Sequence, residues 1–305
     1  MSLTVLAPFT ARDGENLALY EWPLEGWRSG ARQNMPPRGV VLIVHGLGEH
    51  SCRYEDVADR LLDWGFAVRA YDQRGHGQSG GARGVLPHEN ALLDDLEEII
   101  DDTRMRALKL QRSYQGKALA TAPLPLILLG HSLGGLVVSR FVSLKSRPVE
   151  GLVLSSPALD AGLGAWQKFL LGFTPRLFPN LCVGNGLDAQ YLCRDKKVVQ
   201  DYRADRLVHD RISPRLGRFI AEAGPATIDA AVRWRTPTLL MYAGADRLVN
   251  PEGSRAFAQG ATASPAVQPG TVSAACFENF YHELFNEPDA ASVFGTLKTW
   301  LNARF

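Results

Sequence analysis

A serine between two glycines is the part of this sequence best suited to chemistry. Residues 130–134 read GHSLG; they follow the apolar run LPLILL at 124–129 and precede apolar residues at helical spacing. A tight strand-to-helix turn strains the backbone at its apex, and glycines two positions away on either side avoid the clashes of larger residues. The pattern predicts that Ser132 projects above the strand ends as a nucleophile. A serine that merely tolerates the turn is the alternative.

A serine hydroxyl needs a base to take its proton, and the base needs an acid that fixes its tautomer. His282 is predicted as the base because it lies in a loop between the β-like run 275–278 and the last helical pattern. Asp246 is predicted as the acid because it ends the apolar run 238–245. Asp160, which follows another strand-like run, is the alternative acid. The structural alternatives are that His282 is only a surface loop histidine and that Asp246 only caps a turn or helix.

Short apolar runs and helical patterns alternate along the chain. The runs of strand length are 39–46, 66–72, 124–130, 149–156 and 237–246. Segments with apolar residues at helical spacing separate several of them, and one closes the chain at 293–301. This alternation predicts an α/β fold with a mostly parallel, doubly wound sheet. Ligands bind at the carboxyl ends of such strands, where the serine, the acid and the base are all expected to lie.

The interval 157–211 breaks this rhythm, because it is rich in large apolar residues and contains no clear strand. We predict that it is a helical cap over the strand ends, so that residues 1–156 and 212–305 form the core. Additional core helices are the alternative. The cap residues expected to line a route for an acyl chain are Trp166, Phe169 and Phe173. Peripheral contact with a membrane and packing on the core are the other two roles open to them.

Composition excludes several classes of function. The 33 basic and 32 acidic residues leave a net charge of +1, which does not favour a nucleic-acid partner. No apolar run is long enough to span a membrane, and the N-terminus lacks the pattern of a signal peptide. We therefore expect a cytoplasmic protein with reduced cysteines, with membrane association through the cap as an alternative. No CxxC or HExxH pattern occurs, so neither a metal nor another cofactor is expected. The sequence indicates no oligomeric state.

Three motifs in order resemble a known family: HGLGEHSCRY at 45–54, DQRGHGQS at 72–79 and GHSLGG at 130–135. Together they resemble the α/β-hydrolase superfamily over essentially the whole chain, and within it the monoacylglycerol lipase and lysophospholipase-like group. The chain order Ser132, Asp246, His282 is also the order of that superfamily. The resemblance implies a serine carboxylic-ester hydrolase that acts on lipid-like esters with an apolar acyl chain.

The resemblance also implies roles around the nucleophile. The backbone N–H groups of Leu47 and Leu133 would form the oxyanion hole, and the glycines beside Leu47 would let its loop approach closely. Glu49 and Arg53 would border the head-group end of the pocket; an ion pair that shapes the loop is the alternative. Animal monoacylglycerol lipases carry a histidine three residues after the catalytic one. Here Phe285 stands in that place, which is a departure at the glycerol end.

Other functions would use the same residues. An acyltransferase or thioesterase forms the same acyl-enzyme, and so does an amide hydrolase. Iminopeptidases are amide hydrolases of this kind, but the Gly-Gly-x-Pro type of loop expected in them is replaced here by HGLG at 45–48. Dehalogenases and epoxide hydrolases of this fold carry aspartate where Ser132 stands. A non-catalytic ligand-binding relative would usually have lost one of the three residues, and all three are present.

Overall fold

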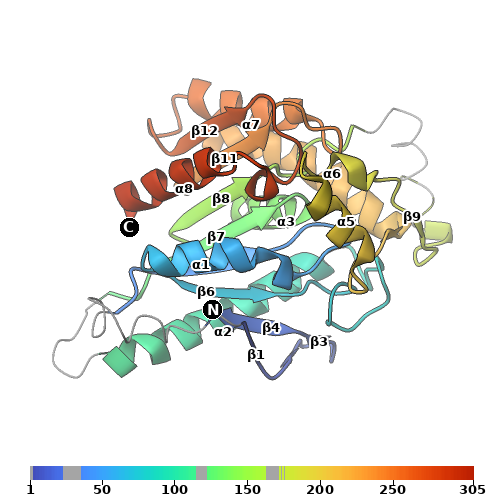
Figure 1. Ribbon diagram of the computed structural model, residues 1–305, viewed down its shortest axis with the longest axis horizontal. Helices are drawn as coiled ribbons and strands as arrows, with labels where there is room; N and C mark the ends of the chain where they lie inside the picture. Colours follow the sequence, from blue (N-terminus) through green and yellow to red (C-terminus); the bar gives the residue numbers. More distant parts are fainter. Residues whose placement is uncertain (1–2, 23–35, 115–121, 163–171, 173, 175) are drawn as a thin grey trace.

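An eight-stranded sheet runs through the centre of the computed structural model, which describes residues 3–22, 36–114, 122–162, 172, 174 and 176–305 (Figure 1). The strand order across the sheet is β1-β4-β6-β5-β7-β8-β11-β12. In this order the strands span Thr4–Val5, Leu19–Trp22, Ala67–Tyr71, Val40–Val44, Leu126–His131, Gly151–Ser155, Thr238–Ala243 and Val272–Phe277.

Most of the sheet is parallel. Every neighbouring pair from β6 to β12 is parallel, whereas β4 pairs antiparallel with both β6 and β1. Every residue of β5, β6, β7 and β8 is buried, because helices cover both faces. Continuous apolar runs are typical of strands in this position. The mostly parallel, doubly wound α/β sheet predicted from the sequence is confirmed.

Two helical layers enclose two apolar cores. One layer contains α1 (Glu55–Asp63) and α8 (Ala291–Arg304). The other contains α2 (Ala91–Tyr114), α3 (Leu133–Leu144), α6 (Pro214–Ala230) and α7 (Pro251–Ala263). Side chains of one strand alternate between them: Leu42 of β5 belongs to the core with α2 and α3, and Ile43 to the core with α1 and α8. The two helical layers thereby support the sheet, including the carboxyl ends of its parallel strands, from both faces.

The remaining elements are short. They are β2 (Phe9–Thr10), β3 (Asn16–Leu17), η2 (Ser51–Tyr54), β9 (Val183–Gly184), η3 (Ala189–Tyr191), α5 (Lys196–Ala204), β10 (Arg211–Ile212), η4 (Ala231–Arg233) and η5 (Leu284–Asn286). The segment from β9 to β10 leaves the sheet between β8 and α6, and β9 pairs antiparallel with β10. This interval therefore contains a short ribbon as well as helix. Among the described residues, no helix is long and apolar enough to cross a membrane.

Candidate active site

Ser132 occupies the sharp turn between β7 and α3. Its φ of 52° and ψ of −118° form a conformation that residues with a side chain rarely adopt. A Cβ atom on Gly130 would lie 2.6 Å from the carbonyl oxygen of Gly134. A Cβ on Gly134 would overlap the carbonyl oxygens of Val44 and His45. Both glycines are thus needed for the helix to start this close to the strands, which leaves Ser132 at the apex of the turn.

Asp246 and His282 meet at the same edge of the sheet. Asp246 follows β11 and His282 follows β12, and the Nδ1 of His282 lies 2.7 Å from Oδ2 of Asp246. The other carboxylate oxygen accepts the backbone N–H groups of Leu248 at 2.9 Å and Val249 at 3.1 Å. A carboxylate only accepts hydrogen bonds, so the proton of the neutral imidazole lies on Nδ1 and Nε2 is left to accept another.

The side chains of His282 and Asp246 are 4% and 1% exposed, and this burial strengthens their electrostatic interaction. Burial alone would lower the pKa of His282, but the charge and hydrogen bond of Asp246, together with Glu283 and Glu49, raise this pKa above 6.5. Burial would raise the pKa of Asp246, but His282 and two backbone donors hold it below 3.8. The pair is therefore built around an ionised carboxylate that stabilises a protonated imidazole.

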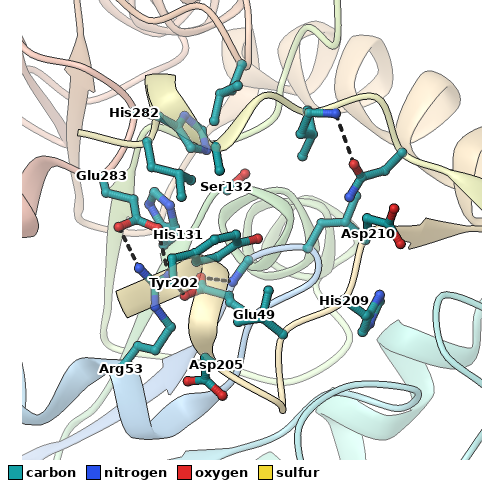
Figure 2. A pocket seen from close by; sticks show the side chains of 18 of the residues that line it. Glu49, Arg53, His131, Ser132, Tyr202, Asp205, His209, Asp210, His282 and Glu283 are labelled. Carbon is teal, nitrogen blue, oxygen red and sulfur yellow. Dashed lines mark hydrogen bonds and ion pairs between the residues drawn. The ribbon is translucent and has the colours of Figure 1, made fainter. Parts of the chain in front are cut away.

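Ser132 and His282 line the same two cavities, and Figure 2 shows both among the residues that line one of them. The His131 ring lies 4.8 Å from the ring of His282, and its Nδ1 lies 3.1 Å from the carbonyl oxygen of Ser155. Burial and the neighbouring His282 lower the pKa of His131 to about 4. His131 is therefore a neutral packing partner at neutral pH.

The loop after β5 lies against the nucleophile. A Cβ on Gly46 would be 3.2 Å from the Cβ of Ser132. Leu47 follows in this loop, and Leu133 is the first residue of α3. Within the described segments, neither the Leu47 N–H nor the Leu133 N–H has a protein acceptor at hydrogen-bonding distance. Free N–H groups on two sides of a serine are the arrangement that an oxyanion requires.

Two cavities of different character meet at Ser132 and His282. An apolar cavity of about 470 Å³ extends beneath the segment from β9 to β10, and its further lining includes Leu133, Phe178, Leu181, Ile212 and Ile220. A second cavity of about 340 Å³ has a mixed lining: apolar side chains such as Leu192 and Val208 lie beside polar and charged ones. We call it the polar cavity after its polar and charged residues, which include Glu49, Arg53, Tyr202, Asp205, His209 and Glu283. An ester bound at Ser132 would thus have an apolar environment on one side and a polar one on the other.

The structure places the other predicted site residues in different ways. Glu49 and Arg53 form an ion pair at 2.6 Å and line the polar cavity. Phe285 lines neither cavity at Ser132; it is buried and its ring lies 5.3 Å from that of Phe294. Because it points into the core beside α8, it is not available to a substrate there. The three aromatic residues predicted to line the acyl route, Trp166, Phe169 and Phe173, lie outside the described residues.

The rival acid lies away from the histidine. Oδ2 of Asp160 accepts a hydrogen bond from the side-chain amide of Asn250 at 2.7 Å, and Oδ1 accepts the Gly162 N–H at 2.9 Å. The contact with Asn250, the residue that caps α7, holds the start of that helix. The structure therefore brings Asp246, and not Asp160, to His282.

In the described part of the chain, no group of three or more His, Cys, Asp or Glu residues could hold a metal ion.

Comparison with known proteins identifies the family. The model of the family described as serine aminopeptidase, S33, matches residues 35–289. The chain belongs to this family. A monoacylglycerol lipase of Mycolicibacterium smegmatis is 34% identical over 87% of this chain and 88% of its own length. The crystal structure of Paleococcus ferrophilus monoacylglycerol lipase superimposes with a TM-score of 0.74 at 33% identity, over 88% of this chain and 96% of that chain.

A further relative of this chain is much longer than the chain itself. It is an uncharacterised abhydrolase domain-containing protein of Dictyostelium discoideum, 30% identical over 96% of this chain, which spans 28% of that protein. These matches confirm the predicted resemblance to α/β-hydrolases of the monoacylglycerol lipase type, and with it the prediction of a serine hydrolase.

Sequence reasoning missed several residues of this S33-family site. Glu283 binds Arg53, and Tyr202 and Asp205 line the polar cavity from the segment between β9 and β10. Glu283 directly follows the predicted base, which was an available signal. Tyr202 and Asp205 carry no local pattern, because only the tertiary fold brings them to the strand ends.

Proposed function

We propose that the protein hydrolyses lipid-like carboxylic esters, of the monoacylglycerol or lysophospholipid type, through an acyl-enzyme on Ser132. The observation that carries this proposal is the junction of an apolar and a polar cavity at Ser132 and His282. A single-chain lipid ester has the matching shape, with an alkyl chain on one side of the carbonyl and a polar alcohol on the other. The names of the related lipases support the same substrate class.

In the proposed reaction, His282 removes the proton of Ser132 as the hydroxyl oxygen attacks the ester carbon. Asp246 keeps the imidazole in the required tautomer and stabilises its protonated form. The tetrahedral intermediate then collapses: the bond to the alcohol oxygen breaks, and His282 gives its proton to the leaving alcohol. Water attacks the acyl-enzyme by the same route and releases the fatty acid and free Ser132.

The negative oxygen of the intermediate is assigned to the N–H groups of Leu47 and Leu133. The close approach of Gly46 to Ser132 supports this assignment, as does the position of Leu133 at the N-terminus of α3. Loss of one donor of this kind typically costs about 2.7–4 kcal/mol of transition-state stabilisation. The assignment thus accounts for a large share of the rate enhancement.

The apolar cavity is proposed to hold the acyl chain. Each buried methylene group contributes roughly 0.8 kcal/mol, so a chain of several methylenes would supply much of the binding free energy. The polar cavity is proposed to receive the alcohol part. The description of the family model suggests another reaction, the hydrolysis of aminoacyl amides. Such a substrate would place a charged amino group, rather than an alkyl chain, beside the nucleophile. The apolar lining of the larger cavity disfavours a charged group there.

We further propose that residues 157–211 form a cap over the active site and that it contacts lipid surfaces. Three apolar side chains of this segment are largely exposed: Leu177 (70%), Phe178 (58%) and Leu181 (57%). Phe178 and Leu181 also line the apolar cavity. Exposed apolar side chains at the entrance of an apolar cavity suit transfer of a substrate from a membrane. The β10 strand crosses the predicted boundary at residue 211, so the cap is expected to end one residue later.

A substrate panel tests the proposed function. Purified protein is offered monoacylglycerols, lysophospholipids, p-nitrophenyl esters, acyl thioesters and aminoacyl amides, with Ser132→Ala as the control. We expect hydrolysis of the esters with a long-chain preference, and none by the control. Turnover confined to aminoacyl amides, or product formed only when a second alcohol accepts the acyl group, would contradict the proposal.

A further inference from the structure

Arg53 is held between two buried glutamates. Its Nη1 donates to Oε2 of Glu49 at 2.6 Å and to Oε1 of Glu283 at 2.7 Å, and its Nη2 donates to Oε2 of Glu283 at 2.8 Å (Figure 2). The side chains of the three residues are 5% exposed for each glutamate and 12% for the arginine. They form a bridge from the segment after β5 to the segment after β12, with one net negative charge.

Each end of this bridge is attached to a group in the proposed reaction. Oε1 of Glu49 accepts the backbone N–H of Gly46 at 2.6 Å, directly before the proposed oxyanion donor Leu47. The Tyr54 hydroxyl donates to the same oxygen at 2.8 Å. At the other end, Glu283 is covalently next to His282. The bridge therefore connects the oxyanion loop with the backbone of the proposed base.

The carboxylate oxygens of the bridge already have protein partners. Besides Arg53, Oε2 of Glu283 accepts from the side-chain amide of Asn286 at 2.7 Å, and the Glu283 N–H donates to the carbonyl oxygen of Leu192 at 2.7 Å. Burial would raise the pKa of Glu49, but Arg53 and nearby histidines lower it to about 2, so it is ionised. Groups so fully engaged are better suited to hold a loop than to bind an incoming alcohol.

We propose that Glu49, Arg53 and Glu283 are positioning residues: they fix the oxyanion loop relative to His282 and place a negative charge beside the imidazole. This inference rests on the proposed serine-hydrolase function but assigns these residues a role other than head-group recognition. His282 is faced by Asp246 and His131 as well as by this bridge. Loss of a bridge carboxylate should therefore make the imidazole less basic without removing its main partner.

The test compares Glu49→Gln, Arg53→Lys and Glu283→Gln with wild type. Asp56→Asn is a matched control, because Asp56 and Arg60 form an exposed i,i+4 ion pair at 3.1 Å on α1 and line neither cavity at Ser132. Three quantities are measured: the second-order rate of Ser132 labelling by a fluorophosphonate, kcat and KM for a p-nitrophenyl ester and a monoacylglycerol of the same acyl chain, and the pH dependence of each. Urea unfolding shows which variants are folded.

The bridge variants should label roughly 10- to 100-fold more slowly than wild type, since small misplacements of catalytic groups have effects of this size. We expect kcat to fall to a similar extent for both esters, with KM little changed, and Glu283→Gln to move the acid limb to lower pH. The Asp56→Asn control should match wild type. Arg53→Lys keeps the charge, so it is informative even if a charge-neutralising variant fails to fold.

Unchanged labelling and pH profiles in folded variants would overturn the inference. So would a loss confined to KM for the monoacylglycerol, which would indicate head-group binding instead. Because labelling requires no natural substrate, it separates the two proposals: a wild-type protein that is labelled but hydrolyses no lipid ester would refute only the proposed substrate class.

Discussion

The Nδ1 of His282 lies 2.7 Å from Oδ2 of Asp246, although 36 positions separate the two residues in the chain. The parallel pairing of β11 with β12 produces this contact, because both residues follow the carboxyl ends of adjacent strands. Two backbone N–H groups bind the other carboxylate oxygen, so contacts other than the one with His282 also orient Asp246.

Replacement of the acid should remove most of the activity. Asp246→Asn keeps the shape but can donate a proton to Nδ1, which favours the wrong imidazole tautomer, and kcat should fall by roughly 10⁴-fold. The matched control is Asp160→Asn, since Asp160 also follows a strand but binds Asn250. We expect this control to keep kcat within a few-fold of wild type. If only the control lost activity while both variants remained folded, the acid would be Asp160.

The pH dependence of kcat/KM should report His282 in the free enzyme. Its pKa is raised above 6.5, mainly by Asp246 acting against burial, and only the neutral imidazole can accept a proton. Activity should therefore decline on acidification, with a midpoint above pH 6.5. In Asp246→Asn the midpoint should move to lower pH, because the charge that raises the pKa is gone. A midpoint below 6.5 in the wild type would argue against this account.

The glycines of the turn should be intolerant of side chains. In Gly134→Ala the new methyl group would overlap the backbone carbonyl oxygens of Val44, the last residue of β5, and His45, which follows it. We expect a loss of about 1–3 kcal/mol in the free energy of unfolding. Gly295→Ala is the control, since Gly295 lies exposed in α8 with open space around it. This change should stabilise the fold by roughly 0.5–1 kcal/mol. Urea unfolding monitored by circular dichroism measures both.

The apolar cavity should set acyl-chain preference. Ile220→Trp, on α6, would fill part of this cavity and shift the preference towards shorter chains. Each excluded methylene costs about 0.8 kcal/mol, or roughly fourfold in kcat/KM. Ile220 also lines a neighbouring cavity beside Asp160. Ile228→Trp lies on the same helix and lines that neighbouring cavity but not the apolar one, so its chain-length profile should match wild type. A p-nitrophenyl ester series measures the profiles, and equal profiles for all three proteins would place the acyl chain elsewhere.

Much of the central sheet could be predicted because its strands are buried on both faces. The apolar run 39–46 contains β5 at Val40–Val44, and the run 66–72 contains β6 at Ala67–Tyr71. The edge strand β1 and its neighbour β4 were not predicted. They are only two and four residues long and include exposed or half-buried polar positions, so they carry no continuous apolar signal.

The candidate site was predictable where local geometry imposes a residue type. The turn at Ser132 needs glycine at positions 130 and 134 for steric reasons, and that requirement is visible in the sequence. The Arg53–Glu283 pair was not predictable, because its members are 230 positions apart and their contact depends on the whole fold. For the same reason the sequence could not indicate that Phe285 packs against Phe294 instead of facing the substrate.

Labelling by a fluorophosphonate, read by mass spectrometry of the modified peptide, tests the central proposal most directly. We expect one adduct, on Ser132, which is absent in Ser132→Ala and forms much more slowly in His282→Ala. Ser139→Ala is the control. Ser139 is buried in α3, the helix that follows Ser132, and its hydroxyl donates to the carbonyl oxygen of Leu136. This variant should be labelled like wild type. Equal labelling of wild type and Ser132→Ala, or an adduct on a different residue, would contradict the assignment of the nucleophile.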